Sequence, residues 1–147
     1  MNQLITGLSI SSAITPTAGV AGTSAINGSV IDTANAEGVL FLVRLGAITA
    51  GAATSIKVQH GAVSNLSDAA DVLGTSQTIA DTADDSIVYV DFKRPTKRYV
   101  RLVVSRATQN AVIASAEAIL YGVRSQPVTQ PAGTVGESFS DAVAGTA

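Results

Sequence analysis

The feature that most constrains the fold is a series of short segments rich in β-branched and aromatic residues, each bounded by turn residues. Val39–Leu45 is apolar on both alternating faces and lies between Gly38 and Gly46, as expected for a central strand that is covered on each side. Ser55–His60 alternates instead between an apolar and a polar face, which is typical of a half-buried strand. Both patterns favour strands over helices.

Further strands are expected near the N-terminus and in the second half of the chain. They cover Leu4–Ile10, Ser29–Thr33, Ser76–Ala80, Ser86–Phe92, Arg98–Arg106 and Ala111–Val123. In the last of these a helical spacing competes with a strand pattern, and its position after the turn at residues 108–110 favours the strand. A short helix is expected only near residues 67–73, with Ser67 as N-cap and Gly74 at its end. This pattern predicts an all-β fold: an antiparallel, jelly-roll-like β-sandwich with at most one short helix.

Small residues indicate how the chain is organised. Ala, Gly, Ser and Thr supply 67 of the 147 residues and are concentrated at the two ends, whereas residues 37–124 hold all but three of the twenty charged residues. We therefore expect one sandwich domain at 29–126, with extended arms at 1–28 and 127–147. Arms of small residues lose little side-chain entropy on ordering, so we expect them to lie on neighbouring subunits.

Composition and charge exclude several classes of protein. The chain has no Cys and one His, His60, which excludes disulfides, thiolate metal sites and multi-histidine metal sites. A net charge of −2 gives no electrostatic reason to expect nucleic-acid binding, and no nucleotide-binding loop occurs. No apolar run approaches the ~20 residues of a membrane helix, and the first residues carry no signal-peptide pattern. We expect no cofactor, no nucleic acid and no membrane partner.

Few residues suggest chemistry. His60 has the apolar parity of its strand and could act as a base in a hydrolase, although a histidine at a strand end more often packs in the core. Carboxylates gather at Asp68 and Asp71 and again at Asp81, Asp84 and Asp85. Their spacing matches no calcium loop, and loop aspartates commonly cap turns. We expect neither an enzyme nor a metal site.

The charges are unevenly distributed. Six of the nine basic residues lie within residues 93–106, which we expect to form a hairpin, and six of the eleven acidic residues lie just before it. Such a hairpin could touch phosphate or simply be solvated, but we favour a subunit contact in which acidic and basic surfaces of neighbours meet. The candidate contact residues are Lys93, Arg94, Lys97, Arg98, Arg101, Asp81, Asp84 and Asp85.

Two stretches carry a resemblance to a known family. One is Ile31–Thr33 followed by Glu37–Gly46; the other is Lys93–Leu102, continuing to Ala118–Arg124 and Pro127. Together they resemble small virion structural proteins of tailed bacteriophages, over roughly residues 29–128. The resemblance implies a β-sandwich decoration, or cement, protein on the head shell, with no catalytic residues. It further implies the major capsid protein as partner, a homotrimer, a place on the capsid surface and synthesis in the bacterial cytoplasm.

These observations predict a structural virion protein that binds the outside of a phage capsid and stabilises it by multiple protein–protein contacts. A tail or head–tail connector component is the first alternative, because strand and turn patterns do not separate these roles. A carbohydrate-binding or host-adhesion sandwich is the second. For sugar stacking the chain offers no Trp and only three tyrosines, Tyr89, Tyr99 and Tyr121.

Overall fold

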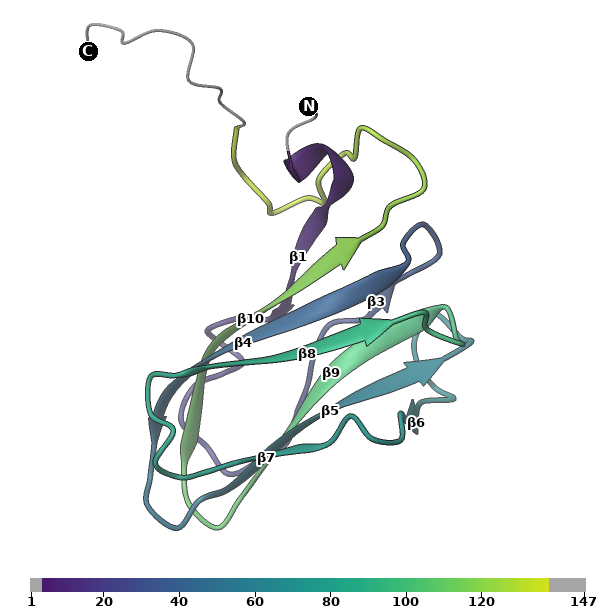
Figure 1. The fold of residues 1–147 in the computed structure, drawn as a ribbon. Helices are drawn as coiled ribbons and strands as arrows, with labels where there is room; N and C mark the ends of the chain where they lie inside the picture. The colour runs from purple at the N-terminus through teal and green to yellow at the C-terminus, as the bar shows by residue number, and fades with distance from the viewer. Residues whose placement is uncertain (1–3, 138–147) are drawn as a thin grey trace, which may run out of the picture.

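The computed structural model describes residues 4–137, which form an antiparallel β-sandwich of two sheets (Figure 1). Sheet A has the strand order β1–β10–β4–β8, and its strands are Ser9–Ile14, Ala111–Tyr121, Gly38–Ile48 and Ile87–Lys93. Sheet B has the order β2–β9–β5–β6, and its strands are Ile26–Asn27, Tyr99–Ala107, Ala53–Gly61 and Ala70–Asp71. Two short strands complete sheet B: β3 (Ile31–Asp32) pairs with β9, and β7 (Gln77–Ile79) pairs with β5.

The strand order is that of a jelly roll. Because β2 and β3 both pair with β9, and β6 and β7 both pair with β5, each couple acts as one interrupted strand, and the ten strands reduce to eight. Numbered along the chain, the first pairs with the eighth, the second with the seventh, the third with the sixth and the fourth with the fifth. This is a long hairpin rolled into two sheets, and it confirms the predicted all-β antiparallel sandwich.

The core lies between the sheets, where alternate residues of facing strands meet. Val39, Phe41 and Val43 of β4 are fully buried there, and Ile56 and Val58 of β5 are fully buried in the same cluster from the other sheet. Alternation therefore places one side of each long strand in the core and leaves the other side on an outer face of the sandwich.

Residues 93–106 do not form the predicted hairpin. β8 belongs to sheet A, where it pairs with β4, whereas β9 belongs to sheet B, where it pairs with β5. The turn at residues 94–98 therefore crosses from one sheet to the other. A turn between two strands looks the same in sequence whether the strands pair with each other or with other strands, so only the jelly-roll pairing decides this point.

The N-terminal segment expected as an arm contributes a strand to each sheet. β1 pairs with β10, with Ala13 and Ile14 buried in the core, and β2 pairs with β9. The strand predicted over residues 4–10 is displaced: Leu4–Gly7 is a single 3₁₀ turn, and β1 starts at Ser9. Ala13, Ile14 and Ile26 join the core from this segment, a role that its overall small-residue composition does not distinguish from an extended arm.

The segment after β10 lies along the outer edge of β1. The side-chain amide of Gln130 accepts a hydrogen bond from the Ile10 amide (2.9 Å) and donates one to the Leu8 carbonyl (2.7 Å). The Thr134 hydroxyl donates to the Ile10 carbonyl (2.8 Å). These contacts satisfy edge groups that would otherwise be open to a further strand. The rest of the predicted C-terminal arm, residues 138–147, lies outside the described residues.

No α-helix forms near residues 67–73 or elsewhere in residues 4–137, so no helix there could cross a membrane. The stretch forms turns and the short strand β6. Asp68 accepts hydrogen bonds from the amides of Ala62 (2.7 Å) and Val63 (3.2 Å). These hydrogen bonds lower the pKa of the Asp68 carboxyl and tie the loop to the end of β5.

Candidate functional site

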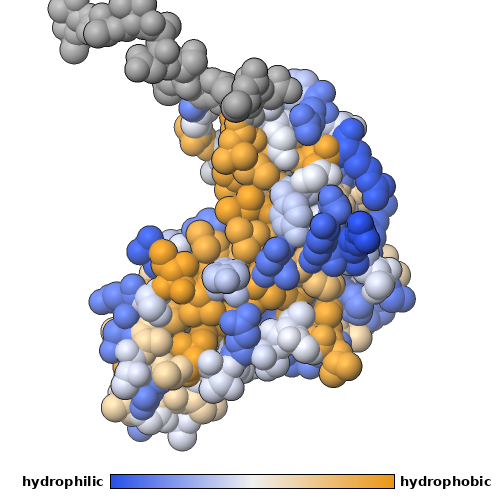
Figure 2. All heavy atoms as spheres, viewed as in Figure 1, coloured by the Kyte–Doolittle hydropathy of each residue, from blue (hydrophilic) through white to orange (hydrophobic). Residues whose placement is uncertain are grey.

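The outer face of sheet A carries a patch of apolar side chains, and no other described element lies over it. Charged residues border this patch on the same face, Glu117 beside Leu42 and Arg44 beside Ile87. Six side chains form this surface, which we call the sheet A face: Ile10, Leu40, Leu42, Ile87, Tyr89 and Ile119. Ile10, Ile119 and Leu40 stand side by side across β1, β10 and β4, and Leu42 stands beside Tyr89 in the next row. The two on β8 are more than half exposed, and the other four are half-buried. Figure 2 shows hydrophobic residues gathered over this part of the molecule.

One corner of sheet A is closed by a tyrosine. The Tyr121 hydroxyl, on β10, donates a 2.6 Å hydrogen bond to the Asp91 carboxylate on β8. The ring passes over Gly38 of β4, where any Cβ atom would collide with it, so the position requires glycine. Burial and the hydrogen bond to Asp91 raise the pKa of Tyr121 to about 12.

The outer face of sheet B is polar and internally bonded. Arg101 Nε donates to Gln59 Oε1 (2.9 Å), and Gln59 Nε2 donates to Asp71 (2.7 Å). Asp71 also forms an ion pair with Lys57 at 2.7 Å, which lowers the pKa of its carboxyl. Arg101, a predicted contact residue, is therefore engaged in a chain of side chains across β9, β5 and β6.

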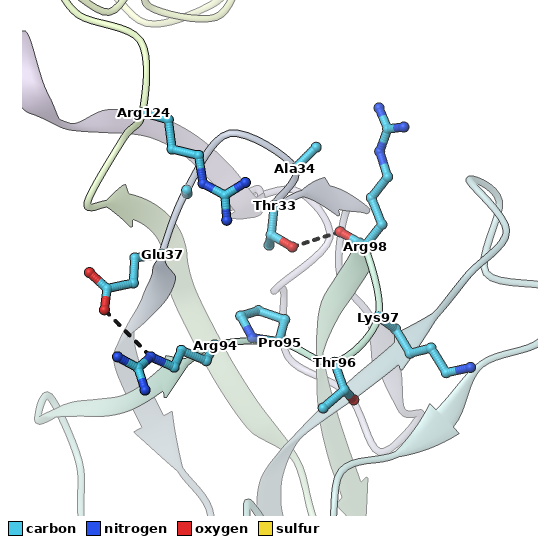
Figure 3. A pocket seen from close by; sticks show the side chains of 10 residues that line it. Thr33, Ala34, Glu37, Arg94, Pro95, Thr96, Lys97, Arg98 and Arg124 are labelled. Atoms are coloured by element: carbon cyan, nitrogen blue, oxygen red, sulfur yellow. Dashed lines mark hydrogen bonds and ion pairs between the residues drawn. The ribbon is translucent and has the colours of Figure 1, made fainter.

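A pocket of about 410 Å³ lies at one end of the sandwich (Figure 3). We call it the basic pocket; its lining residues are Thr33, Ala34, Ala36, Glu37, Arg94, Pro95, Thr96, Lys97, Arg98 and Arg124. The residues come from the turn before β4, the turn between β8 and β9, and the segment after β10. Three of the predicted contact residues, Arg94, Lys97 and Arg98, thus meet around one hollow.

Ion pairs divide the basic side chains of this end into two groups. Arg98 forms a two-bond pair with Asp32, Nε to Oδ1 at 2.9 Å and Nη2 to Oδ2 at 2.7 Å, which lowers the pKa of the Asp32 carboxyl. Lys93 and Arg94 share Glu37 at 3.3 and 3.7 Å. Arg124 and Lys97, by contrast, form no ion pair with any residue of the described range.

Backbone geometry fixes the walls of the basic pocket. Arg94 has a left-handed backbone, φ +52°, and its amide donates to the Glu37 carbonyl (2.8 Å). Gly122, at φ +61°, lies against Glu37, and a Cβ there would stand only 2.6 Å from the Glu37 Cβ. The chain then turns so that the Arg124 amide donates to the Asn35 carbonyl (3.0 Å). Three segments distant in sequence are thereby held around Glu37.

The predicted acidic contact residues lie at the other end of the sandwich. Asp84 accepts a hydrogen bond from the Ile48 amide, and Asp81 accepts one from the Gly51 amide, each at 2.6 Å. They therefore brace the turn between β4 and β5. Asp85 is exposed just before β8, roughly 30 Å along the chain direction of that strand from Arg94 of the basic pocket. Within one chain the structure does not bring the acidic and basic candidates together.

His60 packs between the sheets. Its ring centroid lies 6.5 Å from that of Phe92, and its Nδ1 is buried with no hydrogen-bond partner among the described residues. Residues 4–137 contain no group of three or more His, Asp or Glu side chains that could hold a metal ion.

Two charged residues of the basic pocket could not be recognised from the sequence. Glu37 and Arg124 line the basic pocket, yet neither belongs to the sequence cluster 93–106. Gly122 was the one signal in the sequence, because a glycine two residues before Arg124 permits the left-handed backbone that redirects the chain there. Arg106 belongs to the cluster but is only 9% exposed. Its guanidinium donates to the carbonyls of Ser24, Val20 and Ala111 at 2.7–2.9 Å, so its role is structural.

Neither models of known protein families, nor curated proteins, nor solved structures match the chain. The geometry of the sheet A face and of the basic pocket therefore carries the functional argument.

Proposed function

We propose that the chain is a structural virion protein that binds the outside of a phage capsid and stabilises it by protein–protein contacts. The observation that carries the proposal is the sheet A face, an apolar surface that the described residues leave open to solvent. Large exposed apolar patches mark surfaces that meet other proteins. The resemblance to small virion proteins supports the head shell as the place where this happens.

The size of the sheet A face favours a repeated assembly over an isolated pair. The whole outer side of sheet A, with the polar side chains that border the sheet A face, consists of four strands about 4.8 Å apart and about seven residues long, so it covers roughly 450 Å² per partner. Both partners together would bury about 900 Å², below the 1,200 Å² or more of a specific stable interface. A contact of this size is weak alone, but it gains strength when several identical contacts act together on one shell.

The proposal names its partners and location. The major capsid protein would cover the sheet A face, and a homotrimer would add contacts between copies at the charged ends of the sandwich. The protein would be made in the bacterial cytoplasm and reside on the capsid surface. In this role the chain carries out no reaction and needs no cofactor.

Cosedimentation with empty heads of the phage that encodes the chain tests the proposal. Leu42→Glu places a charge in the middle of the sheet A face, so we expect binding to fall at least tenfold. Leu73→Glu is the matched control, because Leu73 is fully exposed and lies away from that face, and its binding should equal that of the unaltered chain. Ile87→Glu, at a more exposed edge of the face, provides a second variant if Leu42→Glu folds poorly.

Full binding by both sheet A variants, with circular dichroism showing native protein, would reject the sheet A face as the contact. A second arm with purified tails separates the capsid role from a tail or connector role. Binding to tails but not to heads would assign the protein to the tail or connector instead of the capsid.

One observation favours the carbohydrate-binding alternative. Tyr89 is 64% exposed beside a hollow of about 310 Å³ that Gln77, Ile87 and Val88 also line. An exposed aromatic ring next to an amide is a common element of sugar sites. A glycan array probed with the unaltered chain and with Tyr89→Ala decides the matter, since only a sugar site gives hits that the variant loses.

A further inference from the structure

We propose that the basic pocket is a carboxylate-binding site that takes an acidic side chain of a protein partner. The inference rests on the proposed function in one respect, that a protein partner exists. It adds the chemistry by which that partner is held, at a place distinct from the sheet A face.

The charge of the basic pocket is opposite to that of the chain. Its lining, taken with the Asp32 that pairs with Arg98, holds four positive side chains and two negative ones, a net charge of +2. The whole chain carries −2. A local excess of positive charge in an acidic protein attracts anionic groups to this end of the sandwich.

Arg124 and Arg94 are the two basic side chains best placed for a ligand, because Lys97, although without an ion pair in the described residues, extends away from the pocket in Figure 3. Arg98 is occupied by Asp32, and in Figure 3 its side chain extends away from the pocket. Arg124 enters from the β10 side, forms no ion pair within residues 4–137, and points into the hollow. Arg94 approaches from the opposite wall; its side chain is 79% exposed and has only the long contact to Glu37, which Lys93 shares.

The backbone fixes the points from which these two arginine side chains leave the chain. A left-handed backbone is unfavourable for a residue with a side chain and persists where the surrounding structure imposes it, as at Arg94. The Arg124 amide is bonded to Asn35, and buried Val123 anchors the chain just before it. Fixed backbone positions remove part of the entropy cost of ordering this site around a ligand.

The lining favours a carboxylate over nucleic acid or free phosphate. Guanidinium groups match the planar, two-oxygen geometry of a carboxylate. Glu37 stands in the wall and would repel a doubly charged phosphate more strongly than a singly charged carboxylate. No aromatic side chain lines the pocket, so nucleic-acid bases would find no stacking surface there. A volume of about 410 Å³ is at the low end for ligand sites and fits a short segment of side chains.

Titration of the full chain with short peptides tests the inference. The probes are acetyl-Ala-Glu-Glu-Ala-amide, the matched Gln-Gln peptide, and inorganic phosphate, and the readout is the NMR shift of the arginine Nε–H groups. We expect the Glu-Glu peptide to produce saturable shifts at Arg124 and Arg94, while Arg44 on sheet A stays unchanged. Arg124→Gln should weaken binding about tenfold, because a charge-assisted pair is lost, and the matched control Arg44→Gln should leave it unaltered.

Three results would overturn the inference: equal shifts with the Glu-Glu and Gln-Gln peptides, equal weakening by Arg124→Gln and Arg44→Gln, or tighter binding of phosphate than of the Glu-Glu peptide. Cosedimentation with heads separates this inference from the proposed function. Peptide binding without head binding would refute the capsid role alone, and head binding without peptide binding would refute the carboxylate site alone.

Discussion

The two outer faces of this sandwich differ in their side chains: those of sheet B are polar and bonded to one another, whereas sheet A presents an apolar patch. On sheet B the outward residues bond to one another, from Arg101 through Gln59 to Asp71 and Lys57. On sheet A the corresponding positions of β4 carry Leu40 and Leu42, and no described element covers them. A sheet face needs either polar residues that water and neighbours satisfy or apolar residues that something buries. Sheet B meets this need within the chain, whereas on sheet A the described residues leave Leu40 and Leu42 half-buried.

The largest effect on stability is expected at the corner of sheet A that the Tyr121 ring covers. Gly38→Val should lower the free energy of unfolding by about 2 kcal/mol, because the new side chain collides with the Tyr121 ring. Gly136→Val is the matched control: a Cβ there meets nothing within 4 Å, and no change is expected. Urea unfolding measures both. Equal stability of the two variants would mean that the Tyr121 corner is as open as the rest of the sheet A face.

Exchanging side chains between the faces tests the comparison directly. Gln59→Leu on sheet B should cost about 1 kcal/mol, because Arg101 and Asp71 each lose a partner. The reverse exchange on sheet A, Leu42→Gln, should change stability by about 0.5 kcal/mol or less, since it breaks no polar contact at a half-exposed position. Urea unfolding of both variants is the measurement, and a larger loss for Leu42→Gln than for Gln59→Leu would break the comparison.

The smallest expected effect is a pH dependence at the closed corner. The folded-state pKa of Tyr121 is about 12, above the ordinary value of 10.0. The folded state thus favours the neutral phenol, so this contribution to stability is complete below pH 10.0 and is lost as the pH rises towards about 12. Absorbance titration of the phenolate should show one tyrosine ionising late. In Asp91→Asn its pKa should fall, and an unchanged titration would mean that the hydrogen bond to Asp91 does not hold the proton.

Much of the sandwich could be predicted from the sequence because each long strand has a characteristic hydrophobic pattern within a few neighbouring residues. The alternation in Ser55–His60 and the doubly apolar run Val39–Leu45 both became long strands, since a strand presents successive side chains to opposite faces. Short strands were harder to predict from the sequence. Residues 67–73 carry helix-capping signals, but in the structure the Asp68 carboxylate accepts a hydrogen bond from a loop amide instead. The local sequence does not show whether such a residue caps a helix or binds a loop.

Part of the candidate site could also be predicted, because some of its residues are close together in the sequence. Arg94, Lys97 and Arg98 lie in one turn, so their clustering is visible in sequence. Glu37 and Arg124 reach the same pocket only because the third strand of the jelly roll pairs with the sixth on one side and with the eighth on the other. Contacts between residues so far apart depend on strand pairing, which no local pattern encodes.

By itself, the sequence determined the strand type, the all-β class and the apolar character of both sides of β4. The tertiary structure decided that one of those sides faces the core while the other faces outward on sheet A, open among the described residues. It also decided that the acidic and basic candidates stand at opposite ends of β8. Local periodicity fixes which side chains share a face, but which face meets which depends on the packing of the two sheets.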